Sequence, residues 1–116
     1  MGGGPPYLQF RICPLQTGRK PMPVSVVVQF TAAPESRDAF QAVMEGVKTD
    51  LPNVPGCLGV TILQHTEEPG SFTLIETWES RDNHQTHVEA LVADGTWARI
   101  KSLLASAPVS GYFRQV

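Results

Sequence analysis

The chain has 116 residues, of which 41% are hydrophobic and 17% are charged, and its formal net charge at neutral pH is −2. This length accommodates one domain with a single core, and the hydrophobic content argues against intrinsic disorder. The acidic pI of 5.8 excludes the strong positive charge that is typical of nucleic-acid-binding proteins. No apolar run approaches the roughly 18 residues that a membrane-spanning helix needs. We therefore expect neither a nucleic acid nor a membrane as a partner.

The N-terminal segment differs in composition from the rest of the chain. Residues 1–22 contain four of the ten prolines and four of the ten glycines, without apolar periodicity or a signal-peptide core. We interpret them as an arm, flexible or an extension created by the choice of start site, that precedes one domain over residues 23–116. The two cysteines, Cys13 and Cys57, are too few for a disulfide framework, which predicts free thiols and a cytoplasmic location.

The first half of the domain predicts a strand followed by a helix. Residues 24–31 are β-branched and alternating, as in a strand. Pro34 and Glu35 suit a first helical turn, and Pro52 ends the helix. Apolar residues between them recur at helical spacing, at Phe40, Val43, Met44, Val47 and Leu51.

The second half predicts two strands, two helices and a last strand. Residues 57–66 and 72–79 read as strands joined by a turn over residues 67–71. Ser80 is a candidate N-cap for a helix. Its inward stripe is predicted to contain His84, His87, Val88 and Leu91. A short third helix is predicted from the spacing of Trp97, Ile100 and Leu104, with a final strand over residues 109–116.

This order of elements defines the expected fold class, which is α+β. It is the ferredoxin-like split βαβ arrangement, a four-stranded antiparallel sheet with helices on one face. Both faces of the predicted strands contain apolar residues, such as Val26 and Val27 on neighbouring positions. A second copy of the chain would cover the open face, so we expect a homodimer.

A tryptophan and two histidines are the best candidates for chemistry. Trp78 shares a strand face with Phe72, Leu74 and Glu76, so Trp78 and His87 line one space if that face meets the helices. Inward histidines and tryptophans are also common as core residues with satisfied hydrogen bonds. His84 and His87 lack the spacing of a zinc-binding HExxH helix, and we predict no metal.

Other kinds of active site have little support in the sequence. No G-x-S-x-G nucleophile motif is present, and Cys57 lacks a neighbouring base or cation that would activate it. No G-x-G-x-x-G or P-loop motif is present, which argues against a nucleotide cofactor. Tyr112 and Arg114 share a face of the last predicted strand and could reach a ligand or an interface.

Three stretches resemble the antibiotic biosynthesis monooxygenase (ABM) domains of the dimeric α/β-barrel superfamily, over roughly residues 23–116. They are the turn and strand PGCLGVTI (55–62), the segment IETWESRDNHQTH (75–87) with a histidine nine residues after its tryptophan, and HVEALVADGTWARIKSLL (87–104). The resemblance implies a ferredoxin-like homodimer with a pocket between sheet and helices. It also implies an oxygenase that uses O2 on quinols or polycyclic aromatics with no cofactor, neither metal nor flavin.

The same resemblance assigns roles to several side chains. Trp78 and His87 match positions linked to substrate binding and catalysis, with His87 as proton acceptor and Trp78 as a stacking surface. We expect His84, which lies on the inward stripe, to contact a small aromatic substrate together with Asn83, Tyr112 and Trp97, which the resemblance places near the substrate.

The resemblance leaves other activities open. The heme-degrading branch of the superfamily has an asparagine on the first strand, where Ser25 or Gln29 stands here. An isomerase of a small carbonyl compound would need basic residues for a phosphate, and Arg99, Lys101 and Arg114 are not clustered at a helix start. A non-catalytic ligand-binding or stress-related dimer is the remaining alternative.

Overall fold

A computed structural model describes residues 23–116 of the chain, so the proposed arm over residues 1–22, with Cys13, lies outside the described residues. The strands are β1 (Val24–Thr31), β2 (Cys57–Gln64), β3 (Ser71–Trp78) and β4 (Val109–Phe113). The helices are α1 (Arg37–Asp50), α2 (Arg81–Ala93) and α3 (Thr96–Ser102), with 3-10 turns η1 (Pro34–Ser36) and η2 (Leu51–Asn53) beside α1.

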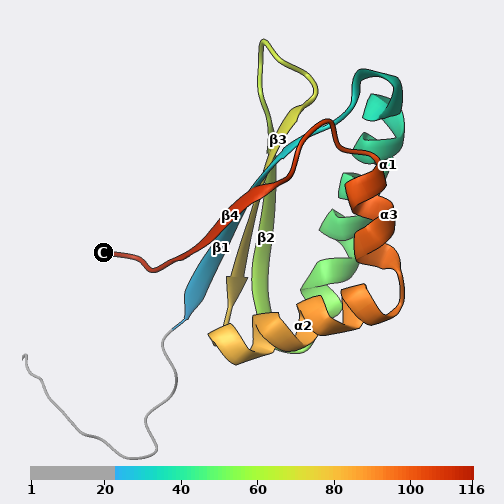
Figure 1. Cartoon of the computed structure of the whole chain (residues 1–116). Helices are drawn as coiled ribbons and strands as arrows, with labels where there is room; N and C mark the ends of the chain where they lie inside the picture. Colours follow the sequence, from blue (N-terminus) through green and yellow to red (C-terminus); the bar gives the residue numbers. More distant parts are fainter. Residues whose placement is uncertain (1–22) are drawn as a thin grey trace, which may run out of the picture.

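The four strands form one antiparallel sheet in the order β2-β3-β1-β4. All three α-helices lie on the same side of this sheet, and the other side is uncovered (Figure 1). The architecture confirms the predicted α+β class and the ferredoxin-like arrangement. Its register places Val26 opposite Glu76 on one side and opposite Tyr112 on the other, so residues of three strands meet at one level of the sheet.

Alternation along β3 decides which side chains enter the interior. Phe72, Leu74, Glu76 and Trp78 are buried, whereas the intervening residues are only half-buried. The first two pack with aromatic and aliphatic residues of α1, α3 and β1. Trp78 belongs to a second cluster, with Val26 and Leu51, at the end of the sheet near α2.

The third helix ends earlier than its apolar spacing suggests. α3 stops at Ser102, and Leu104 instead forms an isolated β-bridge with Ala32. The Ala33 N–H donates to the Leu103 carbonyl, and the Ala105 N–H donates to the Thr31 carbonyl. The chain after Ser102 therefore bonds to the end of β1, and its backbone groups have partners without a further helical turn.

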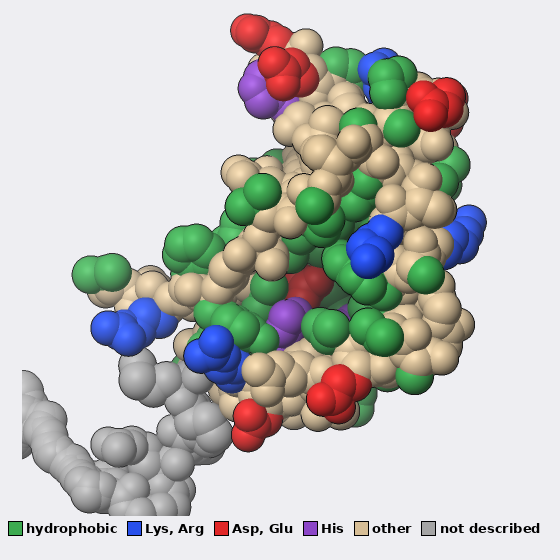
Figure 2. Space-filling view, viewed as in Figure 1, with side chains coloured by type: hydrophobic (Ala, Val, Ile, Leu, Met, Phe, Trp, Pro, Cys, Tyr) green, Lys and Arg blue, Asp and Glu red, His purple; other side chains and the backbone are tan. Residues whose placement is uncertain are grey.

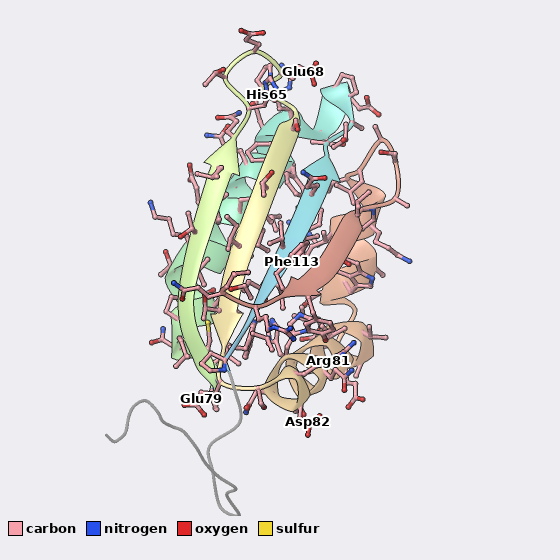
Figure 3. The ribbon with its side chains drawn as sticks, turned by 90° about the vertical axis from the view of Figure 1, so that its left-hand side faces the viewer. His65, Glu68, Glu79, Arg81, Asp82 and Phe113 are labelled. Carbon is pink, nitrogen blue, oxygen red and sulfur yellow. The ribbon has the colours of Figure 1, made fainter. Side chains whose placement is uncertain are left out.

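The uncovered side of the sheet exposes large apolar side chains. Leu63, Val109 and Phe113 are each more than half exposed there, at 52%, 65% and 56%. Figure 3 shows this side toward the viewer, with Phe113 on β4. Among residues 23–116, none of the helices combines the length and the apolar composition that crossing a membrane requires.

Candidate active site

A cavity of about 1050 Å³ lies between the sheet and the helices. Its walls are mainly aliphatic residues of β1, α1 and α2, and its polar side chains come from β3, β4 and all three α-helices. Figure 2 shows the hollow, with acidic and histidine side chains at its base and hydrophobic side chains around its rim. A pocket of this size and lining suits a mostly apolar small molecule that a few polar groups orient.

Glu76 is a buried carboxylate on the wall of this cavity. The alternation of β3 directs it inward, and only 6% of the residue is exposed. The indole N–H of Trp78 donates a hydrogen bond to its Oε1 over 2.8 Å. Burial raises the pKa of the Glu76 carboxyl, and the bond from Trp78 opposes that rise. Glu76 is therefore an acceptor held in place by its neighbour on the same face of the strand.

His84 joins Glu76 to Tyr112. Its Nδ1 lies 2.8 Å from the Tyr112 hydroxyl, and its Nε2 lies 3.8 Å from Glu76 Oε1. Burial lowers the pKa of His84, and the neighbouring His87 lowers it further, so the ring is neutral near pH 7. We infer the tautomer with the proton on Nε2, facing the carboxylate, while the Tyr112 O–H donates to Nδ1. The Arg81 guanidinium lies 4.2 Å from the centre of the Tyr112 ring and covers that face.

His87 lies one helical turn further along α2. Its ring centre is 5.3 Å from that of Trp78, and it borders both the main cavity and a smaller hollow near η2. Burial lowers the pKa of His87, and the charge of Asp94 opposes that shift. Within residues 23–116 no side-chain or backbone group forms a hydrogen bond with its ring. His87 is therefore a neutral imidazole with nitrogen atoms available to a ligand.

The helix that carries both histidines begins at a capped turn. Ser80 Oγ accepts a hydrogen bond from the Asn83 N–H and donates one to Asn83 Oδ1. Asn83 borders the smaller hollow and not the main cavity, so it contributes to the start of α2. The cap fixes the phase of the helix and thereby directs His84, His87, Val88 and Leu91 to the cavity, as their spacing predicts.

The two tryptophans have different environments. Trp97 lies on the wall of the cavity and offers part of its surface to a ligand. Trp78 is fully buried and is absent from the lining, so its indole has no face free for stacking with a substrate. It instead contacts both histidine rings, at 5.6 Å for His84 and 5.3 Å for His87 between ring centres.

Glu76 and Arg81 belong to this site but are not among the residues selected from the sequence. The signal for Glu76 is a single charged residue at an inward position of an otherwise apolar strand face, because such a residue must have a partner when buried. Arg81 had no comparable signal, because its contact is with Tyr112, a residue on a distant strand.

Clustered metal ligands are absent from the described part of the chain. No group of three or more histidine, cysteine, aspartate or glutamate side chains converges there in a way that could hold a metal ion. Ser25 and Gln29 on β1 do not line the cavity, since Val26 and Val28 occupy the inward positions.

The fold and the cavity define a class of small ferredoxin-like proteins with an apolar cavity between sheet and helices. The model of the family described as antibiotic biosynthesis monooxygenase matches residues 23–91, and the chain belongs to this family. No curated protein matches the sequence.

Solved structures with the same fold are similar over most of the domain. One is a candidate antibiotic biosynthesis monooxygenase from Caulobacter crescentus, with 25% identity and a TM-score of 0.69, covering 83% of this chain and 92% of that one. A second, from Bordetella bronchiseptica, has 21% identity and a TM-score of 0.68, with 82% and 98% covered. A third, from Nitrosomonas europaea, has 17% identity and a TM-score of 0.71, with 80% and 98% covered.

Proposed function

We propose that the protein is a cofactor-independent monooxygenase that oxidises a quinol-like or polyphenolic aromatic substrate with O2. Membership of the family supports a monooxygenase. The observation that carries the proposal is the apolar cavity with neutral His84, neutral His87 and the Tyr112 hydroxyl on one side. Such a site can bind a planar aromatic molecule, remove a proton from it and keep bulk water away from the resulting anion.

Each polar residue has a role that follows from its contacts. His87 accepts the proton, because its ring is neutral and unpaired within the described residues. The Tyr112 O–H donates a hydrogen bond to His84, so the Tyr112 oxygen can accept a hydrogen bond from a substrate hydroxyl. Trp97 and the aliphatic walls pack on the rings. Trp78 is a positioning residue, because its indole holds Glu76 and supports both imidazoles.

The chemistry balances without an external reductant when the substrate is an anthrone. Loss of a proton to His87 gives an electron-rich enolate, which passes one electron to O2 and leaves a carbon radical beside superoxide. The two combine at the same carbon, the oxygen takes up a proton, and the hydroperoxide then loses water. The methylene carbon becomes a carbonyl, one atom of O2 is in the product and the other is in water. The protein contributes the proton acceptor, the orientation and the exclusion of solvent.

Oxygen consumption tests this proposal directly. We expect chelator-treated protein to consume O2 with an anthrone, and one oxygen atom of ¹⁸O2 to enter the product. His87→Ala should lower the rate by about 100-fold or more, which is the usual contribution of a general base. His65→Ala is the matched control, because His65 lies in the exposed hairpin after β2, far from α2 (Figure 3). An unchanged rate in His87→Ala would remove it from the mechanism.

The alternative of a non-catalytic binding protein has a distinct outcome in the same assay. Hydroxylated anthraquinones would bind in the cavity, but neither anthrones nor hydroquinones would cause O2 uptake above the uncatalysed rate. Trp78→Phe separates positioning from binding: we expect it to lower the rate, while the affinity for an anthraquinone without a hydroxyl group changes little, because the indole does not line the cavity.

The proposal includes a homodimer formed through the uncovered side of the sheet, in the cytoplasm. The exposed apolar side chains of Leu63, Val109 and Phe113 support this interface, and the free thiol of Cys57 fits a reducing compartment. Sedimentation analysis should show a dimer, and Phe113→Asp should shift it to monomer by burying a charge in the contact. A monomeric wild-type protein would contradict the interface.

A further inference from the structure

The second carboxylate oxygen of Glu76 is available to a ligand. Oε1 accepts the bond from Trp78 and faces His84, whereas Oε2 forms no hydrogen bond with any of residues 23–116. In that part of the chain, Arg37 Nε is the only fully enclosed side-chain polar atom without a partner, so Oε2 retains accessible surface. Glu76 lines the cavity, and of its two carboxylate oxygens Oε2 is the one without a partner among residues 23–116.

The charges around the cavity disfavour an anionic ligand. The charged residues that line it are Asp50, Glu76, Glu89 and Arg99, which are three acids and one base. Glu76 is the buried one, and its field is least screened by water. A carboxylate or phosphate that entered the cavity would approach a like charge in an apolar space.

A cationic ligand is also disfavoured, although Glu76 would attract it. Burial lowers the pKa of both His84 and His87, which means that the same space destabilises positive charge on two imidazoles. Most of the cavity wall is aliphatic, so it replaces only part of the hydration that a desolvated ammonium group loses. An uncharged molecule with a hydroxyl group meets neither penalty and supplies the donor that Oε2 lacks.

We propose that Glu76 is a specificity-determining residue of the cavity: it selects an uncharged aromatic ligand that donates a hydroxyl hydrogen bond to Oε2, and it excludes carboxylated or phosphorylated counterparts. This inference rests on the proposed function for the identity of the cavity as the substrate site. It does not depend on whether the bound molecule is oxidised.

Four anthraquinones that differ at one substituent can test the selection by isothermal titration calorimetry. They carry hydroxymethyl, methyl, carboxylate or aminomethyl at position 2, and none needs to react with O2. At mildly alkaline pH, which favours the ionised carboxylate, we expect the hydroxymethyl compound to bind roughly 10- to 100-fold more tightly than the methyl compound, as expected for a hydrogen bond to a charged acceptor. The carboxylate compound should bind at least about 10-fold more weakly than the methyl compound.

Glu76→Gln removes the charge and keeps the size of the side chain. We expect the hydroxymethyl preference to fall by about 10-fold and binding of the carboxylate compound to improve by about 10-fold. Glu79→Gln is the matched control, because Glu79 is an exposed glutamate just beyond β3, and it should leave all ratios unchanged (Figure 3). Thermal unfolding of each variant checks that it is folded.

Several results would overturn the proposal. They are equal wild-type affinity for the carboxylate and hydroxymethyl compounds, tightest binding of the aminomethyl compound, or ratios that Glu76→Gln leaves unchanged. The wild-type ratios alone decide the matter if Glu76→Gln does not fold. The expected ratios without any O2 uptake would refute the monooxygenase proposal and leave the selection by Glu76 intact.

Discussion

The two ends of the interior are built from the same strand face and yet differ in kind. At one end, the rings of Phe30 and Phe72 each lie 5.2 Å from that of Phe40, and the three form a closed aromatic core, of which only Phe30 also borders the cavity. At the other end, Glu76 and Trp78 continue the alternation of β3, and the space beside them is the cavity. A buried carboxylate and a cavity both lower the free energy of unfolding. The closed aromatic end must therefore supply the stabilising free energy that the cavity end lacks.

The covering helices explain the difference. α1 buries Phe40 and Met44 completely against the sheet, whereas α2 contains no fully buried residue. α2 therefore bridges the cavity end of the sheet and contributes half-buried histidines there (Figure 1). Packing holds α1 against the closed end of the interior. Hydrogen bonds at the N-cap and at His84 hold α2 at the cavity end.

Phe40→Ala should have the largest effect, because it opens the closed end. We expect a loss of about 3–5 kcal/mol in the free energy of unfolding, since a fully buried ring is replaced by a void among other rings. Urea denaturation measures this, with Val92→Ala on the exposed side of α2 as control. A loss below about 1 kcal/mol would show that the aromatic cluster is not the stabilising half.

Trp78→Phe should have an intermediate effect on stability. Removing the indole N–H leaves Glu76 Oε1 without its closest donor, at a cost of about 1–3 kcal/mol. In the background of Glu76→Gln the same substitution should cost less, with a coupling free energy of about 0.5–3 kcal/mol. Additive losses in the double-mutant cycle would mean that the tryptophan stabilises the cavity end by packing alone.

Protonation of the two cavity histidines on acidification should lower the free energy of unfolding slightly. Burial lowers the pKa of His84 and His87 from the ordinary 6.5, so the unfolded chain binds protons more readily than the folded one, and stability falls as pH drops below 6.5. Glu76 acts in the opposite sense, because its raised pKa makes stability fall as pH rises above its ordinary 4.5.

Replacing both His84 and His87 with glutamine isolates the contribution of the histidines to the pH dependence of stability, since Glu76 is present in the wild type and in the double variant. Asp94, which faces His87, also remains. We expect the wild type to lose more stability than the double variant between neutral pH and mildly acidic pH, as measured by chemical denaturation at each pH. Equal losses would show that the imidazoles are hydrated to the same extent in the folded and unfolded states.

The fold was largely predictable because each element follows from a local pattern. The alternation of residues 24–31 and the helical spacing from Phe40 to Leu51 correspond closely to β1 and α1. The error at Leu104 has the same origin, since an apolar residue at helical spacing can also lie in a bridge to a distant strand. The spacing of apolar residues indicates which side chains point inward, but it does not indicate which backbone segment they pair with.

The candidate site was only partly predictable, because its contacts join residues far apart in the sequence. The inward direction of His84 and His87 followed from the stripe of α2. The bond from Tyr112 to His84 spans 28 residues, and no local pattern predicts it. The enclosure of Trp78 behind Glu76 depends on the packing of η2 and β1 against the indole, which involves three separate segments.

Gly56, in the turn before β2, lies close to the start of α2 and leaves no room for a side chain between the two. Its φ of +90° suits glycine, and a Cβ there would come within 2.6 Å of the Asn83 side chain. Its carbonyl also accepts the Glu79 N–H, so the turn before β2 is bonded to the turn before α2. In descendants of this sequence, we expect glycine to be kept at position 56, because any side chain there would strain the backbone and push against Asn83, which would shift α2 and redirect both histidines.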